Sequence, residues 1–302
     1  MAFAVARYEV PVAEPYRLDL TVSVLRRLST NLVDVLTPQG VYLRALGDAL
    51  APMLVRVSSQ QRGRLFVTLE GERRGHLRAL ETVRRMLGTD RTLREFDRGA
   101  ARIPWLRPLA LRMRGVKPPR YPTLWEACVN AIVFQQVSIH AASAILRRYV
   151  VTLGSPIELR DGPTLHAFPD TEVTLRANDD VLRAAGLSTN KIAALRRVAE
   201  ALVSGTLDER MLEERSSVEA AAMLRSIKGI GPWTATVVLL RGLGRLDVFP
   251  MNDSGVAGGL AFVGGSPPEL ENVLDALGSQ RGMLYYHLLL ARLEARGELG
   301  PA

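Results

Sequence analysis

Five prolines between residues 104 and 122 divide the sequence into two parts whose hydrophobic patterns differ. Proline fixes φ and removes a backbone donor, so this segment cannot be one continuous helix and indicates a domain boundary. The 302 residues are enough for about two domains of ordinary size. We therefore expect one domain at residues 1–110 and a second at 111–302.

The first part mixes strand and helix patterns. Apolar residues spaced by three and four predict helices at 18–28 and 75–87. Alternating apolar residues predict strands at 7–12, 41–46, 53–58 and 65–69. A turn at 60–63 would join the last two strands as a hairpin. This mixture is typical of an α+β domain.

From Thr123 onward, nearly every segment has a helical pattern. Thr123, Ser138 and Asp179 are residue types that cap helix N-termini, and each precedes an apolar run. Further amphipathic runs predict helices at 190–203, 217–226, 233–242, 254–262, 268–277 and 282–295. The second part is therefore expected to be all-helical.

The composition is that of a folded globular chain, with 47% apolar and 23% charged residues. The single Cys128 cannot form an intrachain disulfide, and its place on an apolar helix face predicts an inert core thiol. No apolar stretch is long enough to span a membrane, and the four histidines are too scattered for a local metal motif. We expect a cytoplasmic monomer that needs no cofactor.

The net charge of +8 is unevenly distributed. Between Arg56 and Arg120 there are 17 Arg and Lys against six Asp and Glu. Arginine forks match phosphate geometry and release counterions, so this stretch is compatible with a nucleic-acid partner. Arginine is also the usual cation of this chain, which has only three lysines, so many of these side chains could simply solvate helix faces. Both interpretations remain open on charge alone.

The segment LRSIKGIGPWTA at residues 224–235 combines two helical patterns with a short turn that contains Gly229 and Gly231. Glycine permits positive φ and close approach of another backbone, and amides at the start of a helix bind anions. Pro232 suits the first turn of the second helix. A DNA phosphate would fit such a turn, although an ordinary corner between two helices has the same pattern.

The order and spacing of these residues resemble the helix-hairpin-helix of the DNA glycosylase superfamily. Asp253 follows Gly231 by 22 residues, a distance that suits the catalytic aspartate of that superfamily. Residues 129–138 and 186–195 resemble its minor-groove loop and the helix that precedes its hairpin. The chain resembles in particular the bacterial 3-methyladenine DNA glycosylase II branch. The resemblance implies an α+β N-terminal domain followed by an all-α glycosylase domain, with the hairpin at 217–242.

The resemblance also implies the roles of particular residues. Asp253 would be the catalytic residue, stabilising positive charge on the sugar or deprotonating the attacking water. Alone, Asn252, Asp253 and Ser254 also have the pattern of a helix N-cap, and the two roles are compatible because helix-start amides favour an ionised carboxylate. The backbone that would grip a phosphate is that of Ile227, Lys228, Gly229, Ile230, Gly231 and Thr234. A monovalent cation would bind the carbonyls of Arg225, Ile227 and Ile230, and no catalytic metal is expected.

Trp233 stands where superfamily members that also cut the strand carry a lysine nucleophile. The resemblance therefore implies a monofunctional enzyme that uses water. Phe134, Trp233 and Tyr285 are the predicted base-pocket residues, and the indole face of Trp233 suits a cationic alkylated purine. Val237 and Gln280 replace aromatic residues of that branch, so a less aromatic pocket is expected.

Gln135, Gln136 and Val137 form the predicted wedge that fills the gap left by an extracted base. A polar turn between two buried helices is the simpler interpretation of the same residues. The function implied is hydrolysis of the N-glycosidic bond of alkylated bases in duplex DNA, with deaminated and etheno bases as further candidates. Two alternatives stay open: a non-catalytic damage-binding protein of the same fold, and a glycosylase for another lesion such as an oxidised purine.

Overall fold

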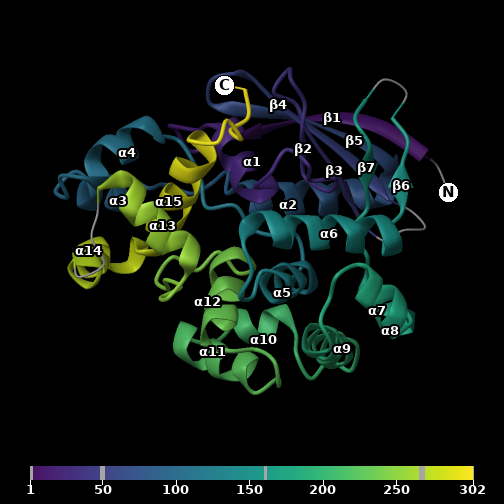
Figure 1. The fold of residues 1–302 in the computed structure, drawn as a ribbon. Helices are drawn as coiled ribbons and strands as arrows, with labels where there is room; N and C mark the ends of the chain where they lie inside the picture. Colours follow the sequence, from purple (N-terminus) through teal and green to yellow (C-terminus); the bar gives the residue numbers. More distant parts are fainter. Residues whose placement is uncertain (1–2, 48–51, 160–161, 265–268, 302) are drawn as a thin grey trace.

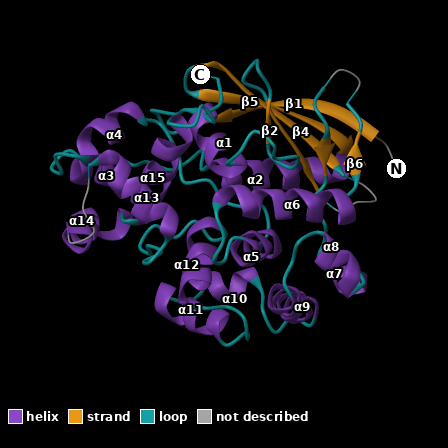
Figure 2. Ribbon diagram, in the orientation of Figure 1, coloured by secondary structure: helices purple, strands orange, loops and turns teal. Residues whose placement is uncertain are grey.

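An antiparallel sheet lies along one side of the molecule, and helices fill the other side (Figure 1 and Figure 2). The computed structural model describes residues 3–47, 52–159, 162–264 and 269–301. The strand order is β1-β5-β4-β3-β2, and every neighbouring pair is antiparallel. The strands are β1 (Phe3–Pro11), β2 (Val35–Leu36), β3 (Tyr42–Leu46), β4 (Met53–Gln61) and β5 (Arg64–Glu72).

Strand β5 shows why these residues form a sheet. Leu65, Val67 and Leu69 are fully buried while the residues between them are partly exposed, as the two-residue period of a strand requires. The buried face shares a hydrophobic core with α1 (Leu18–Arg26) and α2 (His76–Leu87). The four predicted strands and both predicted helices are therefore confirmed. Strand β2 was not predicted, because a strand of two residues is too short to show an alternating hydrophobic pattern.

The proline-containing segment is more regular than expected. It contains the whole of α4 (Leu106–Arg112), and α3 (Arg94–Ala100) ends shortly before it. Pro108 is the third residue of α4, where an amide has no intrahelical acceptor, so the proline breaks no hydrogen bond. Both large hydrophobic clusters contain residues from before and after residue 110; one of them joins Leu20 to Leu284.

The rest of the chain is mainly helical, as predicted. The Thr123 and Ser138 side chains accept the Glu126 and Ala141 amides, which confirms both caps. Within the described ranges, no helix combines the length and the apolar character that crossing a bilayer requires. The remaining elements are α5 (Leu124–Val133), α6 (Ile139–Leu153), β6 (Pro156–Ile157), β7 (Leu165–His166), α7 (Thr171–Arg176), α8 (Asp179–Ala184), α9 (Thr189–Val203), α10 (Glu209–Glu213), α11 (Ser217–Arg225), α12 (Pro232–Arg241), α13 (Ser254–Val263), α14 (Leu270–Leu277) and α15 (Gly282–Glu294).

Two predicted helix starts need comment. Asn178, not Asp179, caps α8, because its side chain accepts the Asp180 amide and Asp179 is already helical. The predicted start of α14 at residue 268 lies outside the described residues, and the described helix begins at Leu270. The shift of one residue at the start of α8 is common where several capping residue types stand together.

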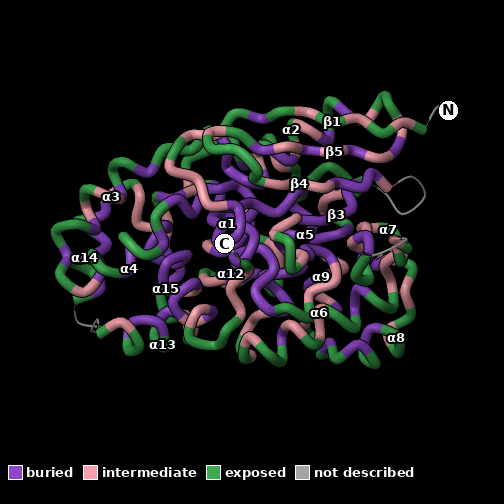
Figure 3. The backbone as a smooth tube through the Cα atoms, turned by 90° about the horizontal axis from the view of Figure 1, so that it is seen from above, coloured by how far each residue is buried: buried purple, intermediate pink, exposed green. Residues whose placement is uncertain are grey.

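Two fully buried helices form the centre of the fold. All residues of α1 and α5 are buried, which Figure 3 shows as continuous buried backbone in α1. Cys128 on α5 is fully buried, and burial raises the pKa of its thiol to about 12. The predicted place of Cys128 in the core is therefore confirmed.

A buried charge network joins the sheet to α5. Arg44 on β3 contacts Asp34 across 2.6 Å and also pairs with Glu126 on α5. All three side chains are almost fully buried. Loss of one partner would leave a buried charge uncompensated, which is far more costly than loss of an exposed ion pair. This network fixes α5, and α5 leads directly into the predicted wedge loop.

Candidate active site

The predicted hairpin is formed by α11, a turn at 226–231 and α12. Gly229 has a φ of 105°, and a Cβ atom there would lie 2.6 Å from the Cβ of Ala194 on α9. Gly231 instead has φ −86° and ψ 178°, which is ordinary extended backbone, and a Cβ atom there would meet nothing within 4 Å. The prediction that the turn requires the conformational freedom of glycine is thus confirmed at Gly229. The same prediction is wrong at Gly231. Gly231 keeps the surface in front of α12 open.

The N-terminus of α12 has no side-chain cap. Gly231 is its N-cap residue and Pro232 its first helical residue, as predicted for the proline. Uncapped amides at a helix start form a ready anion site. Of the carbonyls expected to hold a cation, that of Ile227 accepts the Ile230 amide across 3.0 Å, which leaves its second lone pair available.

Asp253 caps α13 and is held by three hydrogen bonds. Its Oδ1 accepts the amides of Gly255 and Val256 at 2.6 and 3.0 Å. Its Oδ2 accepts the indole N–H of Trp233 at 2.8 Å. A carboxylate offers about four acceptor positions, so one position on Oδ2 remains free of partners among the described residues. The predicted N-cap is confirmed, and the carboxylate is held in a single orientation.

Asp253 and Trp233 line the largest described cavity, with a volume of about 820 Å³. Phe134 and Tyr285 line the same cavity, so the predicted pocket residues come together from α12, the end of α5 and α15. Val237 does not line this cavity, because its side chain is buried in the core with an exposed fraction of 2%. Gln280 lies outside the lining as well. Neither residue contributes to the lining, and a pocket less aromatic than in that branch stays a prediction.

The wedge loop is tied to the hairpin. Gln135 donates from Nε2 to the Gly229 carbonyl at 3.0 Å and to the Thr234 hydroxyl at 2.8 Å. Gln136 is exposed, with a φ of 55°, and Val137 is half-buried against the core. Of the three predicted wedge residues, Gln135 thus has a positioning contact, and Gln136 is the one exposed at the cavity rim.

Four cations at the cavity were not predicted from the sequence: Arg27, Lys191, Arg292 and Arg296. Lys191 donates from Nζ to the Val133 carbonyl at 2.8 Å, and burial lowers the pKa of its ammonium. Burial also lowers the pKa of Arg292. Arg27, Lys191 and the neighbouring Arg292 and Arg296 come from three distant parts of the chain, so no single motif could reveal them.

The Arg-rich stretch from Arg56 to Arg120 contributes no residue to the lining of this cavity. Part of it is neutralised by ion pairs, such as Arg56 with Glu70 at 2.7 Å and Arg85 with Glu209 at 2.6 Å. Strands β4 and β5, which carry its first residues, lie on the opposite side of α5 and α6 from the hairpin (Figure 1). The charge surplus therefore does not mark the cavity.

Comparison with known proteins defines the class of protein to which this fold and site belong. Residues 129–276 match the family model described as HhH-GPD superfamily base excision DNA repair protein. The solved structure of DNA-3-methyladenine glycosidase from Bacillus halodurans is 31% identical, covers 67% of this chain and 91% of that chain, and has a TM-score of 0.51. The chain belongs to the HhH-GPD superfamily, which confirms the resemblance described from its motifs.

Two further relatives extend the comparison. The 3-methyladenine DNA glycosylase from Archaeoglobus fulgidus is 26% identical, with a TM-score of 0.78, and covers 95% of this chain and 99% of that chain. DNA-3-methyladenine glycosylase 2 of Escherichia coli is 31% identical over 139 residues, or 46% of this chain and 48% of that protein. This chain covers 34% to 57% of the length of the curated relatives that it matches. The predicted fold class, an α+β region followed by a helical glycosylase domain, is confirmed.

Proposed function

We propose that this protein is a monofunctional DNA glycosylase that hydrolyses the N-glycosidic bond of alkylated bases in duplex DNA and leaves an abasic site. Deaminated and etheno bases belong to the same proposed range. The observation that carries the proposal is a carboxylate, Asp253, held rigidly in a cavity large enough for a base and lined by three aromatic rings. The names of the relatives, which are 3-methyladenine glycosylases, support the same activity.

Asp253 would act on the sugar. As the bond from C1′ to the base nitrogen breaks, its electron pair leaves with the base and positive charge develops on the sugar. A fixed carboxylate stabilises that charge without reorganising, and this is usually the largest catalytic effect available. Water then attacks C1′, and its proton passes to the carboxylate or the departing base. The free acceptor position on Oδ2 is the one that would face the sugar or the water.

The monofunctional part of the proposal rests on which amines at the cavity could act as nucleophiles. Trp233 has no amine, so it cannot form a Schiff base. Lys191 is the lysine among the described lining residues, and its ammonium is engaged with the Val133 carbonyl. A strand-cutting mechanism would need that amine free and deprotonated.

Three surfaces would hold the DNA. The uncapped amides of α12 would bind a phosphate, exposed Gln136 would fill the gap left by an extracted base, and Arg296 would add positive charge. The protein would work as a cytoplasmic monomer without a cofactor. Base extraction is needed because the reacting carbon is not accessible inside a duplex.

The direct test is base release from duplexes that contain 3-methyladenine, 7-methylguanine, hypoxanthine, ethenoadenine or an oxidised purine. Alkali is added after incubation to convert abasic sites into breaks. We expect breaks with the alkylated substrates only after alkali. Binding without release from any duplex would indicate a damage-binding protein, and release restricted to the oxidised purine would assign a different lesion.

Trapping with borohydride tests the monofunctional part separately. We expect no covalent protein-DNA adduct, because no amine attacks C1′. An adduct that disappears in Lys191→Arg would instead identify Lys191 as a nucleophile. An adduct that persists in that variant would direct attention to the N-terminal amine.

A further inference from the structure

Arg27 occupies an unusual position at the end of α1. Its φ of 59° and ψ of −78° are rare for a residue that is not glycine. Such conformations cost energy and persist where the surrounding structure enforces them. The backbone here directs a long cationic side chain inward, and only 5% of the residue is exposed.

The Arg27 guanidinium is buried without a charge partner among the described residues. No carboxylate of a described residue lies within ion-pair distance, and its Nη1 is buried with no hydrogen-bond partner. Burial lowers the pKa of Arg27, nearby Arg241 lowers it further, and Tyr121, Tyr285 and Asp253 oppose that effect. A buried cation with unused donors is costly unless a ligand supplies the acceptors.

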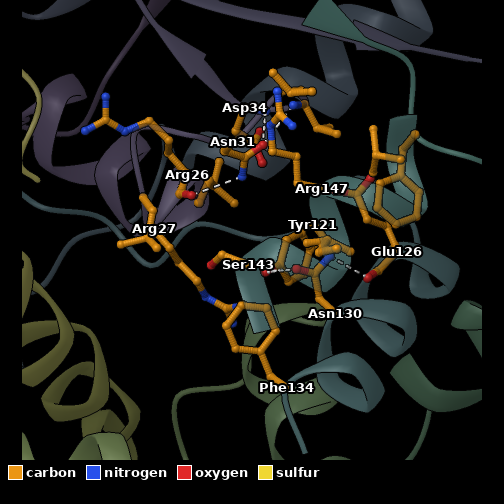
Figure 4. Close-up of a pocket in the computed structure, with 17 residues that line it drawn as sticks. Arg26, Arg27, Asn31, Asp34, Tyr121, Glu126, Asn130, Phe134, Ser143 and Arg147 are labelled. Carbon is orange, nitrogen blue, oxygen red and sulfur yellow. Dashed lines mark hydrogen bonds between the residues drawn. The ribbon is translucent and has the colours of Figure 1, made fainter. Parts of the chain in front are cut away.

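The guanidinium lies over the ring of Phe134, with 3.6 Å between its carbon and the ring centroid. Figure 4 shows Arg27 reaching toward Phe134, whereas Arg26 points away from it. Both Arg27 and Phe134 line the cavity that contains Asp253, which we call the active-site cavity. They also line a second cavity of about 30 Å³. A guanidinium stacked by its face keeps its N–H groups in the plane, where they can reach the edge of a base beside it.

Resting on the proposed function, we infer that Arg27 is a specificity-determining residue that donates hydrogen bonds to an acceptor edge of an extracted neutral base. A neutral purine leaves with the electron pair of the broken bond, so negative charge develops on its nitrogens and carbonyl oxygen. Arg27 stabilises this charge by hydrogen bonding and transfers no proton, because its guanidinium stays protonated.

A cationic alkylated purine has the opposite requirement. The same electron pair neutralises its positive ring, so it leaves as a neutral molecule and gains nothing from a nearby cation. Before the bond breaks, its charge is repelled by the buried Arg27 cation. Arg27 therefore favours neutral bases with acceptor edges, such as hypoxanthine, over cationic bases such as 7-methylguanine.

The test compares two substrates in single-turnover reactions at subsaturating enzyme, where the rate reports transition-state binding from free enzyme and DNA. In Arg27→Met, which keeps the length of the side chain, we expect release of hypoxanthine to fall by about 10- to 100-fold, the range of a charge-assisted hydrogen bond. Release of 7-methylguanine should stay the same or rise. Arg27→Lys, which keeps the charge without the planar fork, should lie between wild type and Arg27→Met.

Arg26→Met is the matched control, because Arg26 ends the same helix and donates to the Glu298 carbonyl instead of facing the active-site cavity. Its ratio of the two rates should equal that of the wild type. An equal loss on both substrates in folded Arg27→Met, or no change on either, would overturn the inference. Failure of the wild type to release any base would instead refute the proposed glycosylase.

Discussion

The indole nitrogen of Trp233 donates to Oδ2 of Asp253 across 2.8 Å, and this bond connects the hairpin helix α12 with the first turn of α13. Trp233 is the second residue of α12, and its own amide is one of the uncapped amides at the helix start. A phosphate held by those amides would therefore lie next to the residue that orients the carboxylate. In the proposed mechanism the hairpin would connect DNA binding with placement of Asp253.

Trp233→Phe tests this connection, because phenylalanine keeps an aromatic face and removes the donor. We expect the single-turnover rate of base release to fall about 10-fold, in line with a hydrogen bond to a charged group, while affinity for the duplex changes little. Trp125→Phe is the control, since Trp125 donates to the Pro169 carbonyl away from the cavity. A wild-type rate in Trp233→Phe would show that Trp233 acts by stacking alone.

The two hairpin glycines should respond differently to substitution. Gly229→Ala should lower the free energy of unfolding by roughly 1–3 kcal/mol, because its φ is positive and the new Cβ would overlap Ala194. Gly231→Val should fold normally and bind damaged and undamaged duplexes more weakly, because its side chain would occupy the space of the phosphate. Lys228→Ala should have much less effect. Unaltered duplex affinity in Gly231→Val would show that the hairpin is only a structural corner.

The salt dependence of binding should separate the cavity cations from the Arg-rich stretch. Arg296→Ala should reduce the slope of log affinity against log salt by about one, as expected for one lost phosphate contact. Arg56→Ala should leave the slope unchanged, because Arg56 pairs with Glu70 on the sheet. The reverse result would move the DNA surface to the N-terminal part.

His287 should make stability depend on pH. Its ring is fully buried against Phe96, donates to the Met283 carbonyl, and has a pKa lowered by burial to about 4. The unfolded chain takes up a proton below about pH 6.5, and the folded protein excludes it until about pH 4, so stability falls as the pH drops through this window by up to about 3 kcal/mol. His287→Phe should lose this component in denaturant titrations at pH 7 and pH 4. An identical pH dependence in both proteins would contradict the assignment.

The sequence was most informative where function depends on local spacing. The hairpin, Pro232 and Asp253 all lie within residues 217–253, and their pattern predicted both the elements and the N-cap. The pattern could not distinguish Gly229 from Gly231, because conformation depends on packing against Ala194. Nor could it reveal Arg27, which reaches the cavity of Asp253 through tertiary packing. Helix α4 was not predicted because Pro108 suggested an interrupted helix. A proline in the first turn is compatible with a helix, and Pro108 lies there.

Asp253→Asn provides the most direct test of the account. Asparagine is an equally good N-cap, so the variant should fold, yet it cannot stabilise positive charge on the sugar. We predict a loss of at least about 100-fold in the rate of base release from an alkylated duplex, with binding retained or tighter. Exposed Asp247 offers the control Asp247→Asn, which should release bases at the wild-type rate. If Asp253→Asn kept more than about a hundredth of the wild-type rate, Asp253 would not be the catalytic carboxylate.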